Sequence, residues 1–307
     1  MSTTLKNVIV SSASGKIGSA IVSALLNSPH GYSVSTLSRE GSSYIPPAGV
    51  TSIKSDYTHD SLVKSLKGQD VVVSAIGGAA VLEQIKIIDA AIEVGVKRFV
   101  PSDFGSDTRI KHSHLRVPFF AMKYQVMKYL EERQDKIEWT VFLSGPLLDE
   151  TLKGGFLGFD IANKTTTFWD ERYKNVRFST ARLTLVADAV AQALSPAISP
   201  KTANQLLAIH DDTVTYAELL KALEAATGSP WPLNHADLDE LVEEGKLKAA
   251  KGDFSGVTHI LVRSILDVEC GGDFDERGIV SNGLVGVEGW GLQRVVDAVV
   301  AEVRGEQ

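Results

Sequence analysis

Lys123 is the residue of this 307-residue chain whose type and position most suggest chemistry. Residues 119–133 have apolar side chains at helical spacing, and at about 100° per residue five of them fall within about 60° of Lys123. Those five are Phe119, Phe120, Val126, Met127 and Leu130. Burial of an unpaired ammonium is costly and lowers its pKa toward values useful in proton transfer. Lys123 is therefore predicted to orient a nicotinamide ribose or to act as general acid or base; a lysine that reaches out of the core to solvent is the alternative.

A second lysine on the same expected helix competes for this role. Tyr124 and Lys128 have the Tyr-x-x-x-Lys spacing with which short-chain dehydrogenases place a phenol beside an ammonium. The helical arithmetic puts Lys128 on the polar face, beside Gln125 and Glu132. Surface pairs with Glu131 and Glu132 are the expected interactions of such a lysine. The Tyr-x-x-x-Lys spacing is therefore interpreted as a coincidence.

A turn that could hold a dinucleotide follows the first apolar run of the chain. Residues 12–18 read Ser-Ala-Ser-Gly-Lys-Ile-Gly, between an expected strand and an expected helix. Their spacing is that of a dinucleotide-binding fingerprint with serine at the first glycine position. Gly15 would let the backbone approach a pyrophosphate, and Gly18 would let helix and strand pack closely. Because free amides at a helix start attract phosphate, Ser12, Ser14 and Gly15 are predicted to contact it; an ordinary strand–helix turn is the alternative.

Arg39 ends the second expected strand and bears on the choice of cofactor. NAD enzymes usually carry an acidic residue here, whereas an arginine accommodates the 2′-phosphate of NADP with two hydrogen bonds. Arg39 therefore predicts NADP(H), and the adjacent Glu40 and a solvated surface arginine are the competing interpretations. The ends of later strands add five predicted cofactor contacts, which are Asp56 and Tyr57 near the adenine and Ala75, Ile76 and Gly77 in a run of mostly small residues.

These residues can be positioned by an alternation of strands and helices that runs to about residue 145. Residues 71–76 form a nearly continuous Val/Ile run, typical of a strand buried on both faces. Strands and helices joined by short connections predict an α/β fold with a doubly wound parallel sheet. Residues 1–150 are expected to form an NADP-binding Rossmann domain. Residues 151–307 are expected to form a smaller α/β substrate-binding domain, which lends some strands to the first sheet, with residues 271–291 as loop.

The composition excludes several classes of protein. Hydrophobic residues make up 44% and charged residues 22% of the chain, as in ordinary globular proteins. A net charge of −7 disfavours nucleic acid and anionic lipid as partners. No apolar run approaches the ~20 residues of a membrane span, and no signal peptide is recognised. The single cysteine, Cys270, allows no intrachain disulfide, and His112 and His114 in an expected solvated loop do not predict a metal. A cytoplasmic protein that acts on small molecules is expected.

Ten consecutive residues resemble a known family. Residues 96–105, Val-Lys-Arg-Phe-Val-Pro-Ser-Asp-Phe-Gly, are similar to the strand-and-loop signature of the NmrA-like and isoflavone-reductase-like proteins, which are atypical short-chain dehydrogenases. Lys123 lies where that family carries its lysine, and residues 138–141 resemble the strand that follows. The resemblance extends to about residue 245. It implies cofactor contacts at Gly15, Lys16, Ile17, Arg39, Phe104, Ser144, Gly145 and Pro146, with Lys123 assisting catalysis.

The leading hypothesis is an NADPH-dependent reductase of a small aromatic or polyketide-like molecule, with hydride transfer to a carbonyl, a conjugated alkene or a benzylic carbon. A non-catalytic NADP(H)-sensing regulator of NmrA type is the alternative, and redox-neutral isomerase or lyase chemistry stays open. The loop over 106–117 differs from the plant reductases, so the substrate is not specified. A homodimer is also left open. The expected walls of the substrate pocket, each of which could equally be core, are Phe104, Leu147, Leu148, Phe156 and Phe159.

Overall fold

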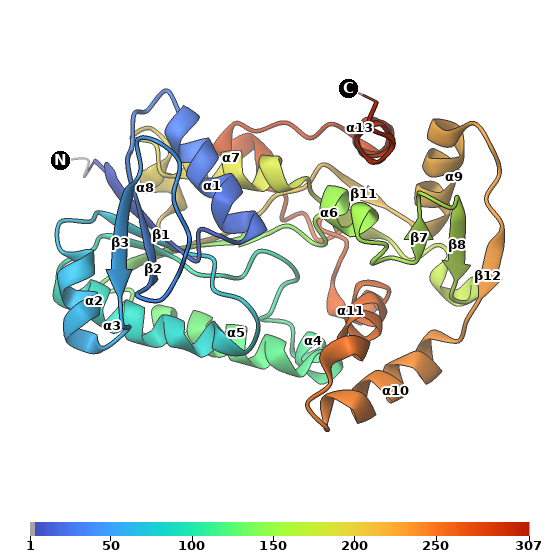
Figure 1. Ribbon diagram of the computed structural model, residues 1–307, viewed down its shortest axis with the longest axis horizontal. Coiled ribbons are helices and arrows are strands. Elements are labelled where there is room, and N and C mark those ends of the chain that lie inside the picture. Colours follow the sequence, from blue (N-terminus) through green and yellow to red (C-terminus); the bar gives the residue numbers. More distant parts are fainter. Residues whose placement is uncertain (1–3, 307) are drawn as a thin grey trace.

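A seven-stranded parallel sheet forms the centre of the protein, in a computed structural model that describes residues 4–306 and only the backbone of Phe254 (Figure 1). The strand order is β10-β6-β5-β4-β1-β2-β3, with the reversal between β1 and β4 that is typical of doubly wound sheets. The predicted α/β fold is confirmed. The strands are β1 (Asn7–Ser11), β2 (Ser33–Arg39), β3 (Thr51–Ser55), β4 (Val71–Ser74), β5 (Arg98–Val100), β6 (Glu138–Leu143) and β10 (Gln205–Ala208).

Helices cover both faces of this sheet. Successive side chains of β1 alternate between two cores, because Val8 and Val10 pack in one and Ile9 in the other. The first core holds α1 (Lys16–Asn27) and α7 (Leu183–Ala193). The second holds α2 (His59–Leu66), α3 (Gln84–Glu93) and α5 (Pro118–Glu131). Burial on both faces explains why the central strands are apolar throughout rather than alternating.

A second group of elements lies to one side of the sheet (Figure 1). Its strands form a three-stranded sheet in the order β12-β8-β7 and an antiparallel pair of β9 and β11. Phe159, Tyr216 and Trp231 lie in its core. The strands are β7 (Phe159–Asp160), β8 (Thr165–Phe168), β9 (Phe178–Thr180), β11 (Asp212–Val214) and β12 (Leu233–His235). The helices are α6 (Leu148–Lys153), α9 (Tyr216–Thr227), α10 (Leu238–Ala249), α11 (Val257–Ile265) and α13 (Leu292–Arg304).

The remaining short helices connect these elements. They are η1 (Gly78–Glu83), α4 (Lys111–Arg116), α8 (Ser199–Thr202), η2 (Glu171–Tyr173), η3 (Phe254–Gly256), η4 (Val268–Cys270) and α12 (Asn282–Val285). One expectation for these regions is wrong, and a second holds except for one short helix. The histidine-containing segment is helix α4, whose Ser113 is buried, and not a solvated loop. The stretch 271–291 is mostly loop but includes α12, where Val285 packs in the core beside α7.

The two parts of the chain are interleaved. β10 follows residue 151 in the chain but pairs with β6 as the edge of the central sheet. Helix α7 likewise packs in the same core as α1. The division at residue 150 stays a prediction. It allows for strands of the second part in the central sheet, and β10 is such a strand. Among residues 4–306, no helix has both the length and the apolar character needed to cross a membrane.

Candidate active site

The turn between β1 and α1 has an open backbone suited to phosphate. Ser12, at the first fingerprint position, adopts the left-handed conformation with φ of 55°. The amide of Gly15 donates to the Ser12 carbonyl at 3.1 Å, which closes the turn. Gly15 then serves as the N-cap of α1, and its position has no side chain to occupy the amides of the first helical turn. Free amides and the positive end of the helix dipole together attract an anion.

Two glycines of this turn have different roles. A Cβ atom at Gly18 would lie 2.5 Å from the Ser12 carbonyl oxygen, so the close approach of α1 to the turn requires glycine there. A Cβ atom at Gly15 would lie 3.5 Å from the same oxygen, an ordinary contact. The protein's own packing therefore does not require Gly15. The space above it is free for a group that approaches the backbone, as the fingerprint predicts for a pyrophosphate.

A hollow of about 510 Å³ lies beside this turn and includes Arg39. Burial raises the pKa of the Tyr57 phenol and the Arg39 guanidinium opposes this shift, which places the two side chains near each other. Lys54 Nζ donates to the Ser42 carbonyl at 2.6 Å and fixes the loop that forms the rim. Glu40, the competing signal for NAD, is not part of the lining. The lining residues are Ser12, Ser14, Leu37, Ser38, Arg39, Gly41, Ser42, Ser43 and Tyr57.

The other predicted cofactor residues lie near the same edge of the sheet but with different surroundings. The carboxylate of Asp56 accepts bonds from the Thr58 amide and hydroxyl at 2.8 and 2.7 Å, so it shapes the turn before α2. Ala75 donates its amide to the Ser11 carbonyl at 3.2 Å and joins the ends of β4 and β1. Ile76 is buried in the core, whereas Gly77 is exposed. Ile17 packs against the core beside α7.

Lys16 connects the phosphate turn to the second part of the protein. Its ammonium forms an ion pair with Glu150 of α6, and Glu150 also pairs with Lys153 at 2.7 Å. Burial alone would raise the pKa of Glu150, but the two lysines outweigh it and lower that pKa. The Lys16 side chain is exposed, so it can exchange this carboxylate for another anion at the helix start.

Lys123 opens onto a cavity of about 460 Å³ walled mostly by apolar side chains. Its side chain is 16% exposed, and burial lowers the pKa of its ammonium while the Asp103 carboxylate, 4.0 Å away, opposes that shift. Four phenylalanines line the cavity. The lining residues are Phe104, Gly105, Ser106, Phe119, Phe120, Lys123, Gly145, Pro146, Leu147, Glu150, Thr151, Gly154, Phe156, Leu261, Ser264 and Ile265.

The turn after β6 forms one side of this cavity. The amides of Ser144 and Gly145 both donate to the Gly105 carbonyl at 3.1 Å, which ties the turn to the loop after β5. Gly145 has φ of 61°, and a Cβ atom there would lie 1.9 Å from the Ser179 carbonyl oxygen. Only glycine fits this position. Gly145 and Pro146 thus contribute backbone and ring to the lining, while the buried Ser144 hydroxyl donates to the Gly145 carbonyl.

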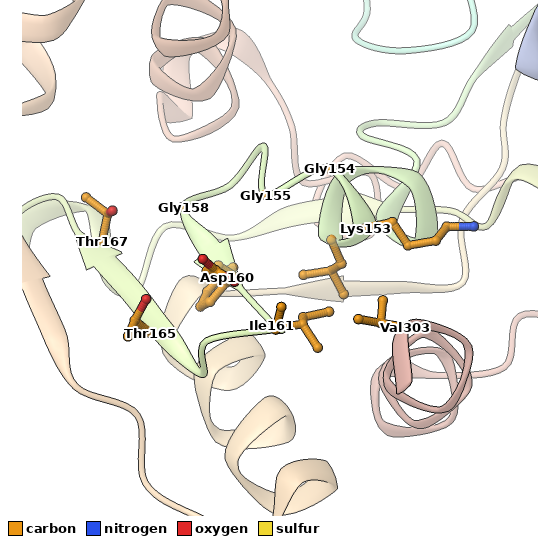
Figure 2. A pocket seen from close by; sticks show the side chains of 12 residues that line it. Lys153, Gly154, Gly155, Gly158, Asp160, Ile161, Thr165, Thr167 and Val303 are labelled. Atoms are coloured by element: carbon orange, nitrogen blue, oxygen red, sulfur yellow. The ribbon is translucent and has the colours of Figure 1, made fainter. Parts of the chain in front are cut away.

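Two expected pocket residues do not line the Lys123 cavity. Leu148 and Phe159 are each 1% exposed and belong to the core of the second part. Phe159 instead borders a different cavity of about 480 Å³ between α6, β7, β8 and α13 (Figure 2). The two cavities share Gly154 alone in their linings. Phe104, Leu147 and Phe156 are the members of the expected wall that face Lys123.

The competing lysine and the histidine pair take structural positions. Lys128 Nζ lies 2.9 Å from Glu131 Oε2 on the surface of α5, as expected for a lysine on the polar face. Tyr124 packs against His114, with ring centroids 4.9 Å apart and the ring planes tilted by 38°. Neither Tyr124 nor Lys128 is part of the cavity lining.

His112 lies in a charged cluster that suits ion pairing better than metal binding. Its ring, the Asp267 carboxylate and the Cys270 thiol place their ligand atoms within 4.8 Å of one another. However, Arg116 and Arg263 already bind the Asp267 carboxylate at 2.7 and 3.1 Å. Two guanidinium groups beside the shared oxygen oppose a further cation. The described residues therefore do not form a favourable metal site there.

Sequence reasoning missed three sets of residues at or near these cavities. Ser42 and Ser43 line the hollow beside Arg39, although they follow it closely in the sequence. Asp103 lies within the ten-residue signature but was not singled out. Helix α11 contributes Leu261, Ser264 and Ile265, whose i, i+3, i+4 spacing marks one helix face. That spacing identifies a face but not what the face contacts.

Comparisons with known proteins identify the family and the fold. The NmrA-like family matches residues 4–244. The oxidoreductase aprR of Aspergillus flavus is 34% identical, covering 96% of this chain and 98% of that protein. Isoflavone reductase homolog P3 of Arabidopsis thaliana is 29% identical, covering 79% and 82%. The crystal structure of an isoflavone reductase superposes with a TM-score of 0.76 at 18% identity, covering 97% and 99%. A complex of leucoanthocyanidin reductase with NADPH from Vitis vinifera also gives 0.76, at 19% identity and with 96% and 99% covered.

Proposed function

Because the chain belongs to the NmrA-like family, we propose that it is an NADPH-dependent oxidoreductase of isoflavone-reductase type that reduces a small aromatic or polyketide-like molecule. The observation that carries the proposal is the Lys123 amine, mostly buried at the wall of an aromatic cavity next to the turn of Gly145 and Pro146. A protein that only senses a nucleotide has no need of a buried proton donor there.

The cofactor would bind along the carboxyl edge of the sheet. Free amides of the turn at Gly15 would hold the pyrophosphate, and Arg39 would bind the 2′-phosphate in the hollow that Ser42 and Tyr57 help to form. Solved neighbours support this choice, since one is a leucoanthocyanidin reductase with NADPH and another a quinone oxidoreductase of Escherichia coli with NADPH. When bound, NADPH supplies a hydride.

The residues around Lys123 would determine what is reduced. Phe104, Phe119, Phe120 and Phe156 give the cavity flat apolar surfaces, which suit an aromatic ring and keep water from the reacting carbon. Lys123 would donate a proton to the oxygen or carbon that gains electron density as the hydride arrives. Carbonyls, conjugated alkenes and benzylic carbons can all be reduced in this way.

Cofactor choice can be tested by calorimetric titration with NADPH and NADH. We expect the protein to bind NADPH at least about tenfold more tightly, which corresponds to about 1.4 kcal/mol. Arg39→Ala should remove most of this difference because the 2′-phosphate loses its bidentate partner. Lys67→Ala, which removes an exposed positive charge elsewhere, is the control. Equal affinity for the two cofactors in the wild type would contradict the proposal.

The role of Lys123 can be tested with Lys123→Met, which keeps the volume and removes the amine. With a panel of aromatic enones and aryl ketones as probes, we expect turnover to fall by about 10²- to 10⁴-fold, the usual contribution of a general acid. NADPH affinity should change by no more than a few fold. Lys128→Met on the same helix is the matched control. Strong discrimination between NADPH and NADP⁺ with no turnover of any probe by the wild type would point instead to a regulator.

A further inference from the structure

The carboxylate of Asp103, in the loop that follows β5, is buried, and one of its two oxygens has no hydrogen-bond partner among the described residues. Asp103 is 3% exposed. Its Oδ2 accepts a hydrogen bond from the Thr108 hydroxyl at 2.9 Å. Its Oδ1 has no hydrogen-bond partner among the described residues and lies 4.0 Å from Lys123 Nζ. A buried acceptor without a partner is costly, so a structure that retains one has a use for it.

The charged groups nearby are already paired with one another. Asp107, close to Asp103, binds Arg109 at 2.8 Å and Arg277 at 2.6 Å. Across the cavity, Glu150 pairs with Lys16 and Lys153. Those carboxylates already form ion pairs with other guanidinium and ammonium groups. Asp103 is therefore the carboxylate available to the Lys123 ammonium.

We propose that Asp103 is the positioning residue of the Lys123 amine: its free Oδ1 accepts a hydrogen bond from Nζ and turns the other N–H bonds into the cavity. This inference rests on the reductase proposed above. Only a small rotation of the lysine separates 4.0 Å from hydrogen-bond distance. The field of the carboxylate also opposes the loss of the ammonium proton that burial favours.

In the reduction of a carbonyl, this arrangement delivers one proton. Bound NADPH would supply the hydride for the new C–H bond, and the electron pair of the C=O π bond would move to oxygen. An N–H bond of Lys123 breaks and an O–H bond forms, which leaves a neutral amine, a neutral alcohol and NADP⁺. Asp103 exchanges no proton in this step, and solvent reprotonates the amine after the product leaves.

The direct test is the pKa of Lys123, read by NMR from protein labelled with ¹³C at the lysine Cε and assigned with Lys123→Met. In Asp103→Asn, which keeps the shape and an acceptor for Thr108, the pKa of Lys123 should fall by about one unit or more because the ammonium loses its opposite charge. In Asp103→Glu, which keeps the negative charge, the pKa of Lys123 should stay close to its wild-type value. Glu131→Gln, which removes a charge on the outer side of the same helix, should leave it unchanged.

A reciprocal measurement keeps the test valid even where Asp103→Asn does not fold. In Lys123→Met, the pKa of the Asp103 carboxyl should rise by about one unit, because burial is no longer opposed by the ammonium. Unchanged pKa values in both variants would overturn the inference. A wild-type protein with the expected coupling but without reductase turnover would instead overturn the proposed reaction and leave the pair intact. With an active wild type, the alkaline limb of the kcat profile should move to lower pH in Asp103→Asn.

Discussion

Ser12 holds a conformation that glycine usually supplies at the start of a phosphate turn. A left-handed backbone costs a residue with a Cβ atom about 1–2 kcal/mol, and Ser12 adopts it with φ of 55°. The turn still closes through the bond from Gly15 to Ser12. The serine at the first position therefore does not abolish the geometry that the fingerprint requires. Its hydroxyl adds a polar group to the hollow that includes Arg39.

The two glycines of the turn should separate stability from cofactor binding. Gly18→Ala places a Cβ atom 2.5 Å from a carbonyl oxygen, and we expect a loss of about 2–3 kcal/mol in the free energy of unfolding. Gly15→Ala meets only an ordinary contact and should cost less than about 1 kcal/mol, the effect of a weaker N-cap. The order should be reversed for NADPH affinity: Gly15→Ala should weaken NADPH binding to the folded protein more than Gly18→Ala does. Urea denaturation and calorimetry measure both quantities, and equal stability losses would contradict this division.

At the scale of the elements, Asp70 fixes the starts of three neighbouring strands. Its carboxylate accepts hydrogen bonds from the backbone amides of Lys6 and Asn7, at 2.9 and 2.8 Å, at the start of β1. It also pairs with Lys97, just before β5, at 2.7 Å. Burial alone would raise the pKa of Asp70, but these bonds outweigh it and lower the pKa below its usual range.

This lowered pKa predicts an acid dependence of stability. A carboxyl group with a lower pKa in the folded than in the unfolded state stabilises the protein above its unfolded pKa of about 3.9, and this contribution is lost as the pH falls through the folded value. Asp70→Asn should therefore lower stability at pH 7 and flatten the fall in stability between about pH 5 and pH 3. Asp60→Asn, at the exposed start of α2, is the control. Thermal unfolding across this pH range would detect the difference, and parallel curves for wild type and Asp70→Asn would refute it.

Elements with strong local signals were predictable from sequence, and those whose burial depends on distant contacts were not. The apolar strand pattern that starts at residue 138 and the Thr215–Glu218 capping box are local signals, and β6 and α9 begin at them. Helix α4 is short and polar in sequence, and its place against α11 comes from tertiary packing. The candidate site divides in the same way. Lys123 and the phosphate turn carry local signals, whereas the contribution of α11 depends on residues far apart in the chain meeting across the cavity.

At the scale of the whole molecule, Asp211 joins three distant segments. Its carboxylate binds Arg182, which follows β9, at 2.8 Å, and accepts a hydrogen bond from the Trp290 amide, just before α13, at 2.8 Å. The Arg182 guanidinium also lies 3.6 Å from the centroid of a Trp290 ring. Both partners of the ion pair are buried. The C-terminal segment is thereby bound to the end of β9 and the start of β11.

Removal of Asp211 should be costly, because Arg182 would then be buried without its partner. We expect Asp211→Ala to lower the free energy of unfolding by about 3–5 kcal/mol, the usual effect of breaking a buried pair. Asp297→Ala, an exposed carboxylate on α13, should change it by less than about 0.5 kcal/mol. Guanidinium denaturation of both variants gives the comparison. A small effect of Asp211→Ala would mean that Arg182 finds solvent or another acceptor.

Strand β10 is synthesised well after β6, the strand with which it pairs, and this order affects folding during translation. β6 ends at Leu143, but the strand that covers its free edge begins only at Gln205. At synthesis rates of about 5–20 residues per second, the intervening chain takes roughly 3–12 s to make. During that interval an apolar strand has an unpaired edge, the kind of surface that chaperones bind and that pairs with other nascent chains. Slow codons between β6 and β10 would lengthen the exposure, so translation speed over this stretch should govern the yield of folded protein more than it does elsewhere in the gene.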